Sequence, residues 1–219
     1  MLDNLKAIEV YSADIGVLDD EKLYNALYEF VSPARIERVK RMYRDTDRKL
    51  SILSEALLIY ALKHNGYDKA IEFETGKNGK PYLKDRKFNF NISHSGSRAV
   101  CAITDMKCDI GCDIEAVTEY DSRIAKRIFD EREQASLAAA SEDEVDLLFT
   151  ELWTKKESYI KCTGLGLTSV SSNIGEGYAF LSFNGLEGYK LTLCVNCKEE
   201  PKVDFIEVTN AMLIEICNR

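Results

Sequence analysis

Apolar and polar residues alternate along several short segments of this 219-residue chain, and longer segments repeat instead at helical spacing. Alternation predicts strands, because successive strand side chains point to opposite faces. The predicted strands lie near residues 71–75, 87–93, 98–104, 109–115, 178–183, 189–196 and 203–208. The predicted helices lie near residues 47–64, 121–139 and 143–162. By itself the pattern indicates a mixed α/β chain with mostly local hairpins.

The predicted strand at 109–115 carries acidic residues on one face. Ile110, Cys112 and Ile114 occupy its core face, which leaves Asp113 and Glu115 together on the other face. A pair of this kind is either a solvated strand edge or part of a site for a hard divalent cation, which prefers carboxylate oxygens.

The last predicted helix carries charges that could join this pair. Trp153, Glu157 and Lys161 are four residues apart and therefore share one stripe. Three carboxylates, from Asp113, Glu115 and Glu157, could then meet at one Mg²⁺ that also takes substrate phosphate oxygens. The alternative is an ordinary wet helix face, where charge pairs contribute only about 0.2–0.5 kcal/mol.

The predicted strand at 87–93 ends in a polar turn, Ser93-His94-Ser95-Gly96. Hydroxyls, an imidazole and free backbone N–H groups can face a phosphate there. A single histidine can equally be structural. Within this turn we interpret His94 as a hydrogen-bond donor to phosphate rather than as a base.

Charge is distributed unevenly along the chain. The formal net charge is −8, which argues against a general nucleic-acid binder, because such proteins need a broad basic surface. Between Arg35 and Lys49, however, seven basic residues stand against three acidic ones, a local charge of +4. This run alone could be a solvated helix face. Beside a phosphate site it is better interpreted as an anion-binding patch.

Composition adds little to this picture. With 45% hydrophobic and 30% charged residues the chain resembles ordinary soluble proteins. It has no apolar run of membrane-spanning length and no basic region leading into an apolar run. We therefore expect no membrane span, no secretory signal and a cytoplasmic location. The seven scattered cysteines are expected to be buried free thiols, and the lone Cys194-x-x-Cys197 pair gives little support for zinc.

Taken together, the polar segments resemble the 4'-phosphopantetheinyl transferases of the surfactin-synthetase-activating (Sfp) type. The motifs that carry the resemblance are Gly79-Lys80-Pro81, Phe90-Asn91-Ile92-Ser93-His94-Ser95, Ile110-Gly111-Cys112-Asp113-Ile114-Glu115 and Trp153-x-x-Lys156-Glu157-Ser158-x-x-Lys161. They occur in family order and span roughly residues 30–170. The chain length fits the monomeric, two-halved members, so the resemblance implies a monomer.

The resemblance also implies an α+β fold of two similar α/β halves related by a pseudo-twofold axis. Residues 1–107 would form the N-terminal half, with the basic segment and the Ser-His-Ser turn. Residues 108–219 would form the C-terminal half, with the carboxylates and the catalytic helix. The active site would lie in the cleft between the halves, near residues 105–110.

The implied activity is transfer of 4'-phosphopantetheine from coenzyme A to a serine of an acyl- or peptidyl-carrier protein, with release of 3',5'-ADP. Mg²⁺, or Mn²⁺ in its place, would be held by Asp113, Glu115 and Glu157. By resemblance the catalytic residues are Asp113, Glu157 and Lys161. Glu157 would accept the serine proton, directly or through a bound water, and Lys161 would protonate or stabilise the leaving phosphate.

Coenzyme A would be bound by residues from both halves. The implied contacts are Arg35, Arg38, Lys80, Pro81, Ser93, His94, Lys156 and Lys161. The family commonly has a further arginine where this chain has Leu50, and Arg48 or Lys49 is the candidate substitute. The carrier protein would pack against residues 120–140. The candidate contacts there are Arg123, Lys126, Arg127, Ile128 and Phe129.

Two other classes of function stay open from the residues alone. One is a different Mg²⁺-dependent phosphoryl or nucleotide enzyme with the same carboxylates. The other is a non-catalytic module that holds coenzyme A or a carrier protein. A mass gain on a carrier serine, with release of 3',5'-ADP, would distinguish the transferase from the first, and the presence of Asp113, Glu115, Glu157 and Lys161 argues against the second.

Overall fold

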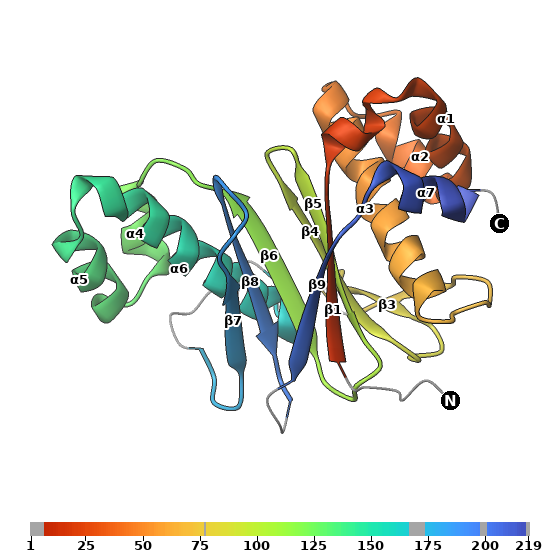
Figure 1. Ribbon diagram of the computed structural model, residues 1–219. Coiled ribbons are helices and arrows are strands. Elements are labelled where there is room, and N and C mark those ends of the chain that lie inside the picture. The colour runs from red at the N-terminus through yellow and green to blue at the C-terminus, as the bar shows by residue number, and fades with distance from the viewer. Residues whose placement is uncertain (1–6, 77, 167–173, 198–200, 218–219) are drawn as a thin grey trace.

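Two β-sheets form the centre of the structure, and helices cover their outer faces (Figure 1). The structure is a computed structural model and describes residues 7–76, 78–166, 174–197 and 201–217. The first sheet has the strand order β4-β5-β1-β9, the second has the order β6-β8-β7, and β2 pairs with β3. The strands are β1 (Ala7–Asp14), β2 (Phe73–Thr75), β3 (Pro81–Leu83), β4 (Asn89–Ser95), β5 (Arg98–Thr104), β6 (Ile110–Ala116), β7 (Ala179–Phe183), β8 (Tyr189–Val195) and β9 (Lys202–Glu207). The predicted α+β class is confirmed.

The helices fall into two groups, one beside each sheet (Figure 1). The group beside the first sheet is η1 (Ile15–Asp19), α1 (Glu21–Phe30), α2 (Pro33–Val39), α3 (Asp45–His64) and α7 (Asn210–Cys217). The group beside the second sheet is α4 (Ser122–Ile128), α5 (Glu131–Ala139) and α6 (Glu142–Thr163). None of the helices in the described ranges is long and apolar enough to cross a membrane.

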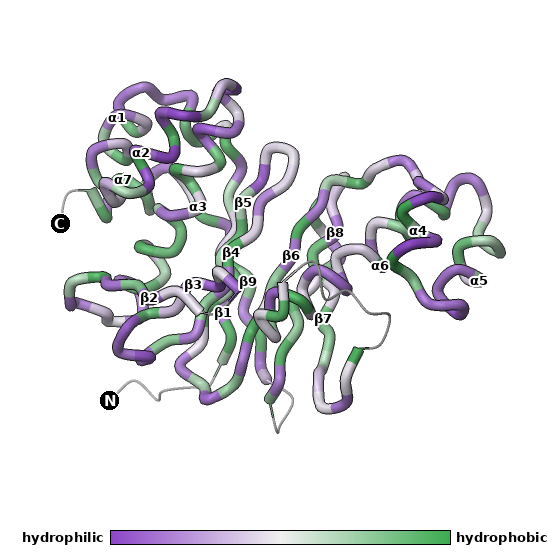
Figure 2. The backbone as a smooth tube through the Cα atoms, turned by 180° about the vertical axis from the view of Figure 1, so that it is seen from behind, coloured by the Kyte–Doolittle hydropathy of each residue, from purple (hydrophilic) through white to green (hydrophobic). Residues whose placement is uncertain are grey.

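Strand alternation divides the apolar residues between two cores. In β5, Cys101 and Ile103 pack with Leu57 of α3, whereas Val100 and Ala102 face the second sheet. The strand is thus buried on both faces, which is why it reads as a continuous apolar run. Figure 2 shows the apolar positions gathered along these strands and α3, while polar positions dominate the outer helices.

The two long helices begin and end close to the predicted positions. α3 starts at Asp45, two residues before the predicted start, and its first turn carries acidic residues that suit the positive end of the helix dipole. Past its end, Gly66 has a positive φ of 71°. α6 runs from Glu142 to Thr163 and ends at Gly164, which takes the left-handed conformation typical of glycine caps.

The predicted helix at 121–139 is instead two helices, α4 and α5. The break falls at Asp130, whose side chain accepts hydrogen bonds from the backbone N–H groups of Arg132 and Glu133. Glu133 returns a contact to the Asp130 backbone N–H, which completes a capping box and starts a new helix. Phe129, just before the break, is buried against Phe149. Phe129 is therefore a core residue rather than a surface contact.

The strand β1 is central to the first sheet and was not predicted. It pairs antiparallel with β5 and parallel with β9, which comes from the opposite end of the chain. β6 likewise pairs with the distant β8. The expectation of mostly local hairpins holds for β2-β3, β4-β5 and β7-β8 only. Residues 202–217, assigned from sequence to the second half, join the first sheet through β9 and pack on α1 and α3 through α7.

Gly111 allows α6 to lie directly on β6. A Cβ atom at this position would stand 2.2 Å from the carbonyl oxygen of Ser158 and 2.3 Å from the backbone N of Cys162. Both contacts are with helix backbone, so no side-chain rotation could relieve them. The close approach brings the turn of α6 that carries Glu157 and Lys161 up to Asp113, two residues beyond Gly111 in β6.

We predict that Gly111→Ala separates α6 from β6 and lowers the free energy of unfolding by at least about 3 kcal/mol. Urea denaturation of the variant measures the loss. Gly66→Ala is the matched control, because its added Cβ meets nothing within 4 Å and only the positive φ is strained. That control should lose about 1–2 kcal/mol. Equal losses in the two variants would contradict the close approach.

Candidate active site

β4 lies at the edge of the first sheet and β6 at the edge of the second. Side chains of β4 accept hydrogen bonds from backbone N–H groups of β6. The Asn91 Oδ1 atom accepts a hydrogen bond of 2.9 Å from the Cys112 backbone N–H, and Ser95 Oγ accepts one of 3.2 Å from Ala116. These contacts supply partners for N–H groups at a strand edge. Asn91, Ser93 and Ser95 are spaced two residues apart, so one face of β4 meets β6 along its length.

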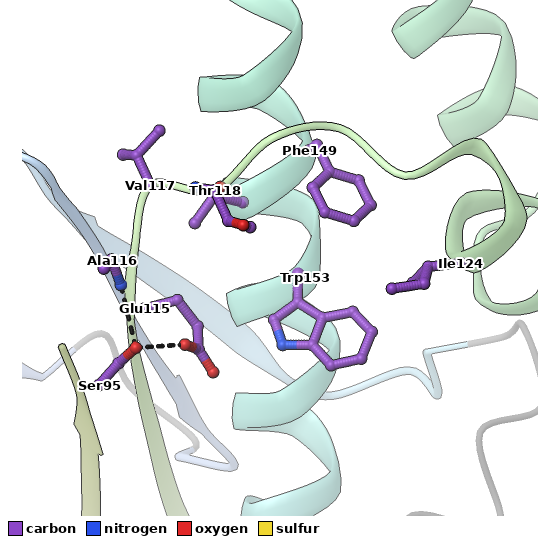
Figure 3. Close-up of a pocket in the computed structure, with 9 residues that line it drawn as sticks. Ser95, Glu115, Ala116, Val117, Thr118, Ile124, Phe149 and Trp153 are labelled. Carbon is purple, nitrogen blue, oxygen red and sulfur yellow. Dashed lines mark hydrogen bonds between the residues drawn. The ribbon is translucent and has the colours of Figure 1, made fainter.

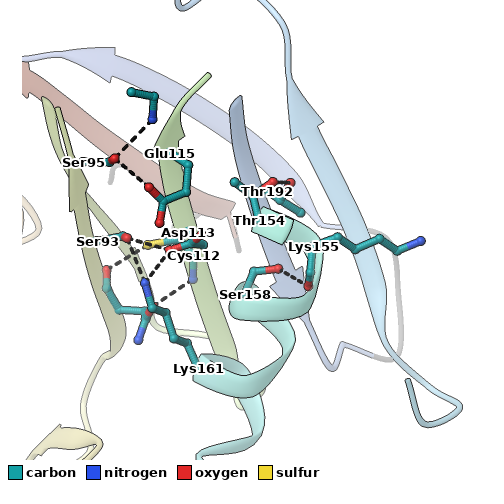
Figure 4. Close-up of polar contacts among 12 residues, drawn as sticks. Ser93, Ser95, Cys112, Asp113, Glu115, Thr154, Lys155, Ser158, Lys161 and Thr192 are labelled. Atoms are coloured by element: carbon teal, nitrogen blue, oxygen red, sulfur yellow. Dashed lines mark hydrogen bonds and ion pairs between the residues drawn. The ribbon is translucent and has the colours of Figure 1, made fainter. Parts of the chain in front are cut away.

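The same face of β4 holds the two acidic side chains of β6 (Figure 4). Ser93 Oγ donates to Asp113 Oδ1 at 2.8 Å, and Ser95 Oγ donates to Glu115 Oε2 at 2.6 Å. The predicted strand faces are confirmed, because Ile110, Cys112 and Ile114 pack in the core between the sheets. Asp113 is itself only 2% exposed, which the alternation pattern did not indicate.

α6 supplies the remaining charged groups. Lys161 Nζ is 2.5 Å from Asp113 Oδ1 and donates to Ser93 Oγ at 2.8 Å (Figure 4). Glu157 lies one turn earlier and interacts electrostatically with both Asp113 and Glu115. The structure thus brings Asp113, Glu115, Glu157 and Lys161 into one neighbourhood between β6 and α6.

The electrostatics of this acidic cluster reflect burial and mutual repulsion. Burial raises the pKa of Asp113, against the opposing pull of Lys161 and Ser93. Burial also raises the pKa values of Glu115 and Glu157, and the neighbouring Asp113 charge adds to both shifts. Burial disfavours the Lys161 ammonium, but its neighbours, chiefly Asp113, together outweigh burial and raise the pKa of Lys161. One lysine therefore faces three carboxylates, and the cluster favours a further cation.

One carboxylate oxygen in the cluster has no partner. Asp113 Oδ2 is buried, and within the described part of the chain nothing donates a hydrogen bond to it. A buried acceptor of this kind is costly unless a donor or a cation reaches it. The oxygen donors suit Mg²⁺. No group of three or more His, Cys, Asp or Glu side chains among the described residues is already arranged to hold a metal ion. The residue types fit the cation, while the ligand set is not preassembled.

A cavity of about 460 Å³ lies beside α2 and carries the predicted basic residues Arg35 and Arg38. Its apolar wall includes Phe73, Phe90 and Ile92. A second cavity, of about 370 Å³, is lined by Glu157 and Lys161. The cavities share three lining residues, Gly79, Pro81 and Ile92. The two cavities are therefore neighbours, the larger at the arginines of α2 and the smaller at Glu157 and Lys161.

Arg35 is held in place by the buried Glu55 of α3. Glu55 Oε2 accepts from Arg35 Nε at 2.7 Å, and its other oxygen accepts from the Ser32 backbone N–H at 2.7 Å. Ser32 in turn caps the start of α2. Glu55 thus fixes both the helix and its first arginine. Arg38, one turn later, is exposed at the cavity.

His94 lies within the electrostatic reach of both groups of cations. Loss of hydration around its ring lowers its pKa, and the charges of Lys161, Arg38 and Arg35 lower it further. The neutral imidazole is therefore favoured, which suits a hydrogen-bonding role better than that of a fixed charge. Contact between His94 and phosphate stays a prediction.

Two of the predicted coenzyme A contacts, Lys80 and Lys156, have protein partners. Lys80 lines the smaller cavity, but its ammonium donates to the carbonyl oxygens of Ile110 at 3.0 Å and Cys162 at 2.8 Å. Lys156 is only 4% exposed and its ammonium is 2.9 Å from Glu133, so it ties α6 to α5. Phosphate contact by these two lysines stays a prediction from resemblance.

The two candidate substitutes for the missing family arginine also have other partners. Arg48 Nε donates to the Met42 carbonyl oxygen at 2.9 Å, and Lys49 Nζ is 2.7 Å from Asp19. The described lining of the basic cavity includes neither of them. The cavity instead draws its positive charge from α2.

Sequence reasoning missed the supporting roles of Asn91, Glu55 and Glu133, and it placed Ser93 to Ser95 in a turn, whereas they belong to β4. A signal for Asn91 exists in the chain, since Asn91, Ser93 and Ser95 alternate with the same period as Asp113 and Glu115. For Glu55 and Glu133 no such signal exists, because each meets its partner through helix packing. All seven cysteines are free, as predicted, although Cys197 and Cys217 are partly exposed.

Comparison with known proteins identifies the family. A model of the 4'-phosphopantetheinyl transferase superfamily matches residues 109–204, and a model of the 4'-phosphopantetheinyl transferase N-terminal region matches residues 20–105. The chain is 32% identical to 4'-phosphopantetheinyl transferase gsp of Aneurinibacillus migulanus over 91% of this chain and 89% of that protein. The chain belongs to the 4'-phosphopantetheinyl transferase family. The predicted resemblance and the predicted enzyme class, a transferase, are both confirmed.

Two further relatives of this transferase chain show how far the similarity extends. 4'-Phosphopantetheinyl transferase Sfp of Bacillus subtilis (strain 168) is 37% identical over 64% of this chain, and the match spans 62% of that protein. L-aminoadipate-semialdehyde dehydrogenase-phosphopantetheinyl transferase of Saccharomyces cerevisiae is 30% identical over 92% of this chain and 76% of that protein.

We predict that Lys161→Met destabilises the protein in a pH-dependent way when divalent cations are removed with a chelator. Asp113 then stays buried without its cation. The expected loss at pH 7 is about 2–3 kcal/mol, less than for a fully buried pair because the Lys161 side chain is 27% exposed. Without Lys161 the pKa of folded Asp113 rises further above its unfolded value, so protonation favours the folded state. The loss should therefore shrink as pH falls from 7 to 5.

Denaturation with urea at several pH values measures this loss. The double variant Asp113→Asn with Lys161→Met is the control, because it removes the charge that protonation would remove. Its stability relative to the wild type should vary much less with pH. A loss in Lys161→Met that is the same at pH 5 and pH 7 would show that Lys161 does not neutralise Asp113.

Proposed function

We propose that this chain transfers the 4'-phosphopantetheine group of coenzyme A to a serine of an acyl- or peptidyl-carrier protein in a Mg²⁺-dependent reaction. Family membership supports the reaction class. The observation that carries the proposal is the meeting of Asp113, Glu115, Glu157 and Lys161 beside the basic cavity of α2. An acidic cluster for a cation and a basic cavity for phosphates suit a substrate that carries both a diphosphate and a separate phosphate.

The acidic cluster would bind the reacting diphosphate. Asp113, Glu115 and Glu157 would hold Mg²⁺, or Mn²⁺ in its place, which when bound would neutralise charge on the phosphoryl oxygens. Asp113 Oδ2 is the oxygen that lacks a protein partner. Lys161, fixed by Asp113 and Ser93, would direct its positive charge toward the leaving phosphate.

Proton transfer would accompany the attack. The carrier serine oxygen forms a bond to the β-phosphorus of coenzyme A, and the bond from that phosphorus to the bridging oxygen breaks, so that 3',5'-ADP leaves. Serine is a weak nucleophile unless a base takes its proton. Glu157 is the proposed base, directly or through a water, because burial and its acidic neighbours raise its pKa and so make it a better proton acceptor.

The basic cavity would hold the nucleotide end of coenzyme A. Arg38 is exposed at the cavity, whereas Arg35 is oriented by Glu55. Pro81 belongs to the shared wall, Ser93 accepts a hydrogen bond from Lys161, and His94 feels the charges of Lys161, Arg38 and Arg35. Apolar side chains of the cavity, such as Phe73 and Ile92, suit contact with a base ring.

The proposed organisation of the chain follows the family. We propose two halves, residues 1–107 and 108–219, related by a pseudo-twofold axis. In support, each large sheet has one long helix on its outer face, α3 on the first and α6 on the second (Figure 1). The exchange of β9 and α7 onto the first half would then tie the halves together. A cytoplasmic location and a monomeric state stay predictions from the sequence.

Carrier binding is proposed at α4 and α5, which project beyond the second sheet (Figure 1). Arg123, Lys126 and Arg127 are exposed on α4. Carrier proteins are usually acidic around the modified serine, so these cations suit the partner.

We predict that the purified chain, given coenzyme A, Mg²⁺ and an apo-carrier protein, adds one phosphopantetheine to the carrier serine and releases 3',5'-ADP. Asp113→Ala should lower this rate by about 10²–10³-fold, because a charge-stabilising group is lost. Mass spectrometry of the carrier measures the transfer. Asp204→Ala is the control, because it removes an acidic residue of β9 that lies outside the acidic cluster. It should keep the wild-type rate. Nucleotide hydrolysis without carrier modification would favour a different phosphoryl enzyme.

We predict that Arg38→Ala raises the KM for coenzyme A about tenfold and changes kcat much less, because a charge-assisted contact to a remote phosphate contributes to binding rather than to chemistry. Steady-state kinetics with varied coenzyme A measures both constants. Arg44→Ala removes the same charge from the same basic run outside the cavity lining and should leave KM unchanged. A fall in kcat without a change in KM would place Arg38 at the reacting phosphate instead.

A further inference from the structure

Glu115 depends on hydrogen bonds rather than on an ion pair for its orientation. Lys161 pairs with Asp113, but in the described structure no lysine or arginine pairs with Glu115. Its Oε2 atom instead accepts a hydrogen bond of 2.6 Å from Ser95 Oγ. Ser93 and Ser95 thus face Asp113 and Glu115 in matching order along β4 and β6.

The Ser95 hydroxyl acts as the hydrogen-bond donor in its contact with Glu115. Its oxygen already accepts the Ala116 backbone N–H at 3.2 Å, so its own hydrogen is the one donated to Glu115. Both anchors belong to strands, because Ser95 ends β4 and Ala116 ends β6. Ser95 therefore fixes the orientation of the Glu115 carboxylate relative to the backbone of β6.

Trp153 reaches the same carboxylate from α6. Ser95, Glu115 and Trp153 line one cavity of about 450 Å³, and Figure 3 shows the indole nitrogen of Trp153 turned toward Glu115. Trp153 lies one turn before Glu157, so the brace and the proposed base belong to the same helix face.

We propose that Ser95 is a positioning residue that orients the Glu115 carboxylate toward the divalent cation, with Trp153 bracing it from α6. The inference rests on the proposed function, because it takes Glu115 as a cation ligand. A carboxylate has about four lone-pair sites, so the Ser95 hydrogen bond leaves others for the cation. Hydrogen bonds that orient metal ligands typically change metal affinity about 10–100-fold.

The chain contains a reporter for this test. Trp153 is its single tryptophan, so intrinsic indole fluorescence comes from the site itself. Mn²⁺ is paramagnetic and quenches a nearby indole, and it shares the oxygen ligands of Mg²⁺. Titration of the metal-free protein with Mn²⁺ should quench the emission to saturation, and excess Mg²⁺ should restore it.

Ser95→Ala should raise the half-saturating Mn²⁺ concentration at least about tenfold, whereas Ser95→Thr, which keeps the hydroxyl, should stay within about threefold of the wild type. Transfer assays separate positioning from substrate contact. With excess Mg²⁺ the turnover of Ser95→Ala should return close to the wild-type value, and the KM for coenzyme A should not change.

Ser97→Ala is the matched control. Ser97 lies two residues beyond Ser95 and also donates its hydroxyl to a carboxylate, but that carboxylate is Asp14, outside the acidic cluster. Its half-saturating Mn²⁺ concentration and its transfer rate should equal those of the wild type. Thermal unfolding of each variant shows whether the fold is kept.

The possible failures are distinguishable. Equal Mn²⁺ affinity in Ser95→Ala and wild type would overturn the positioning role and leave the proposed transfer untouched. A loss of turnover that excess Mg²⁺ does not restore would also overturn it, and would assign Ser95 to substrate binding. A wild-type protein that shows no saturable quenching and modifies its carrier fully in chelator would overturn the proposed metal dependence together with this inference.

Discussion

The contact of Asp113 with Lys161 and Ser93 joins the three elements on which the site depends. Asp113 belongs to β6, Lys161 to α6 and Ser93 to β4, and all three meet at a single carboxylate oxygen. A buried acid tolerates this position only because a cation and a hydroxyl accompany it. The approach of α6 in turn requires glycine at position 111. Packing and chemistry are therefore set by the same few residues.

This three-way contact lies between the two large sheets, where side chains of the edge strand β4 supply hydrogen-bond partners to the edge strand β6. β4 offers an amide and two hydroxyls to β6, which uses them for backbone N–H groups as well as for its acids. A strand edge without such partners would favour pairing with another chain. The polar face of β4 thus has two effects, since it closes the fold and orients the groups proposed to bind the cation.

Much of the site could be predicted because it depends on local spacing. Alternation in 110–115 placed Asp113 and Glu115 on one face, and helical spacing placed Glu157 and Lys161 on one stripe. Long-range packing could not be predicted in this way. The parallel pairing of β1 with β9 depends on contacts between the two ends of the chain. The partner of Lys156 could not be predicted either. Its place in a charged helical motif does not indicate that Glu133 of α5 lies beside it.

The two carboxylate oxygens of Asp113 have different partners, and this difference bears on how the site would bind a cation. Oδ1 is shared by Lys161 and Ser93, whereas Oδ2 has no partner among the described residues. Lys161 contacts Oδ1 alone. Its position on Oδ1 leaves Oδ2 available. Lysine and divalent cation could then act on one carboxylate together, so that the lysine stays in place to face the leaving phosphate.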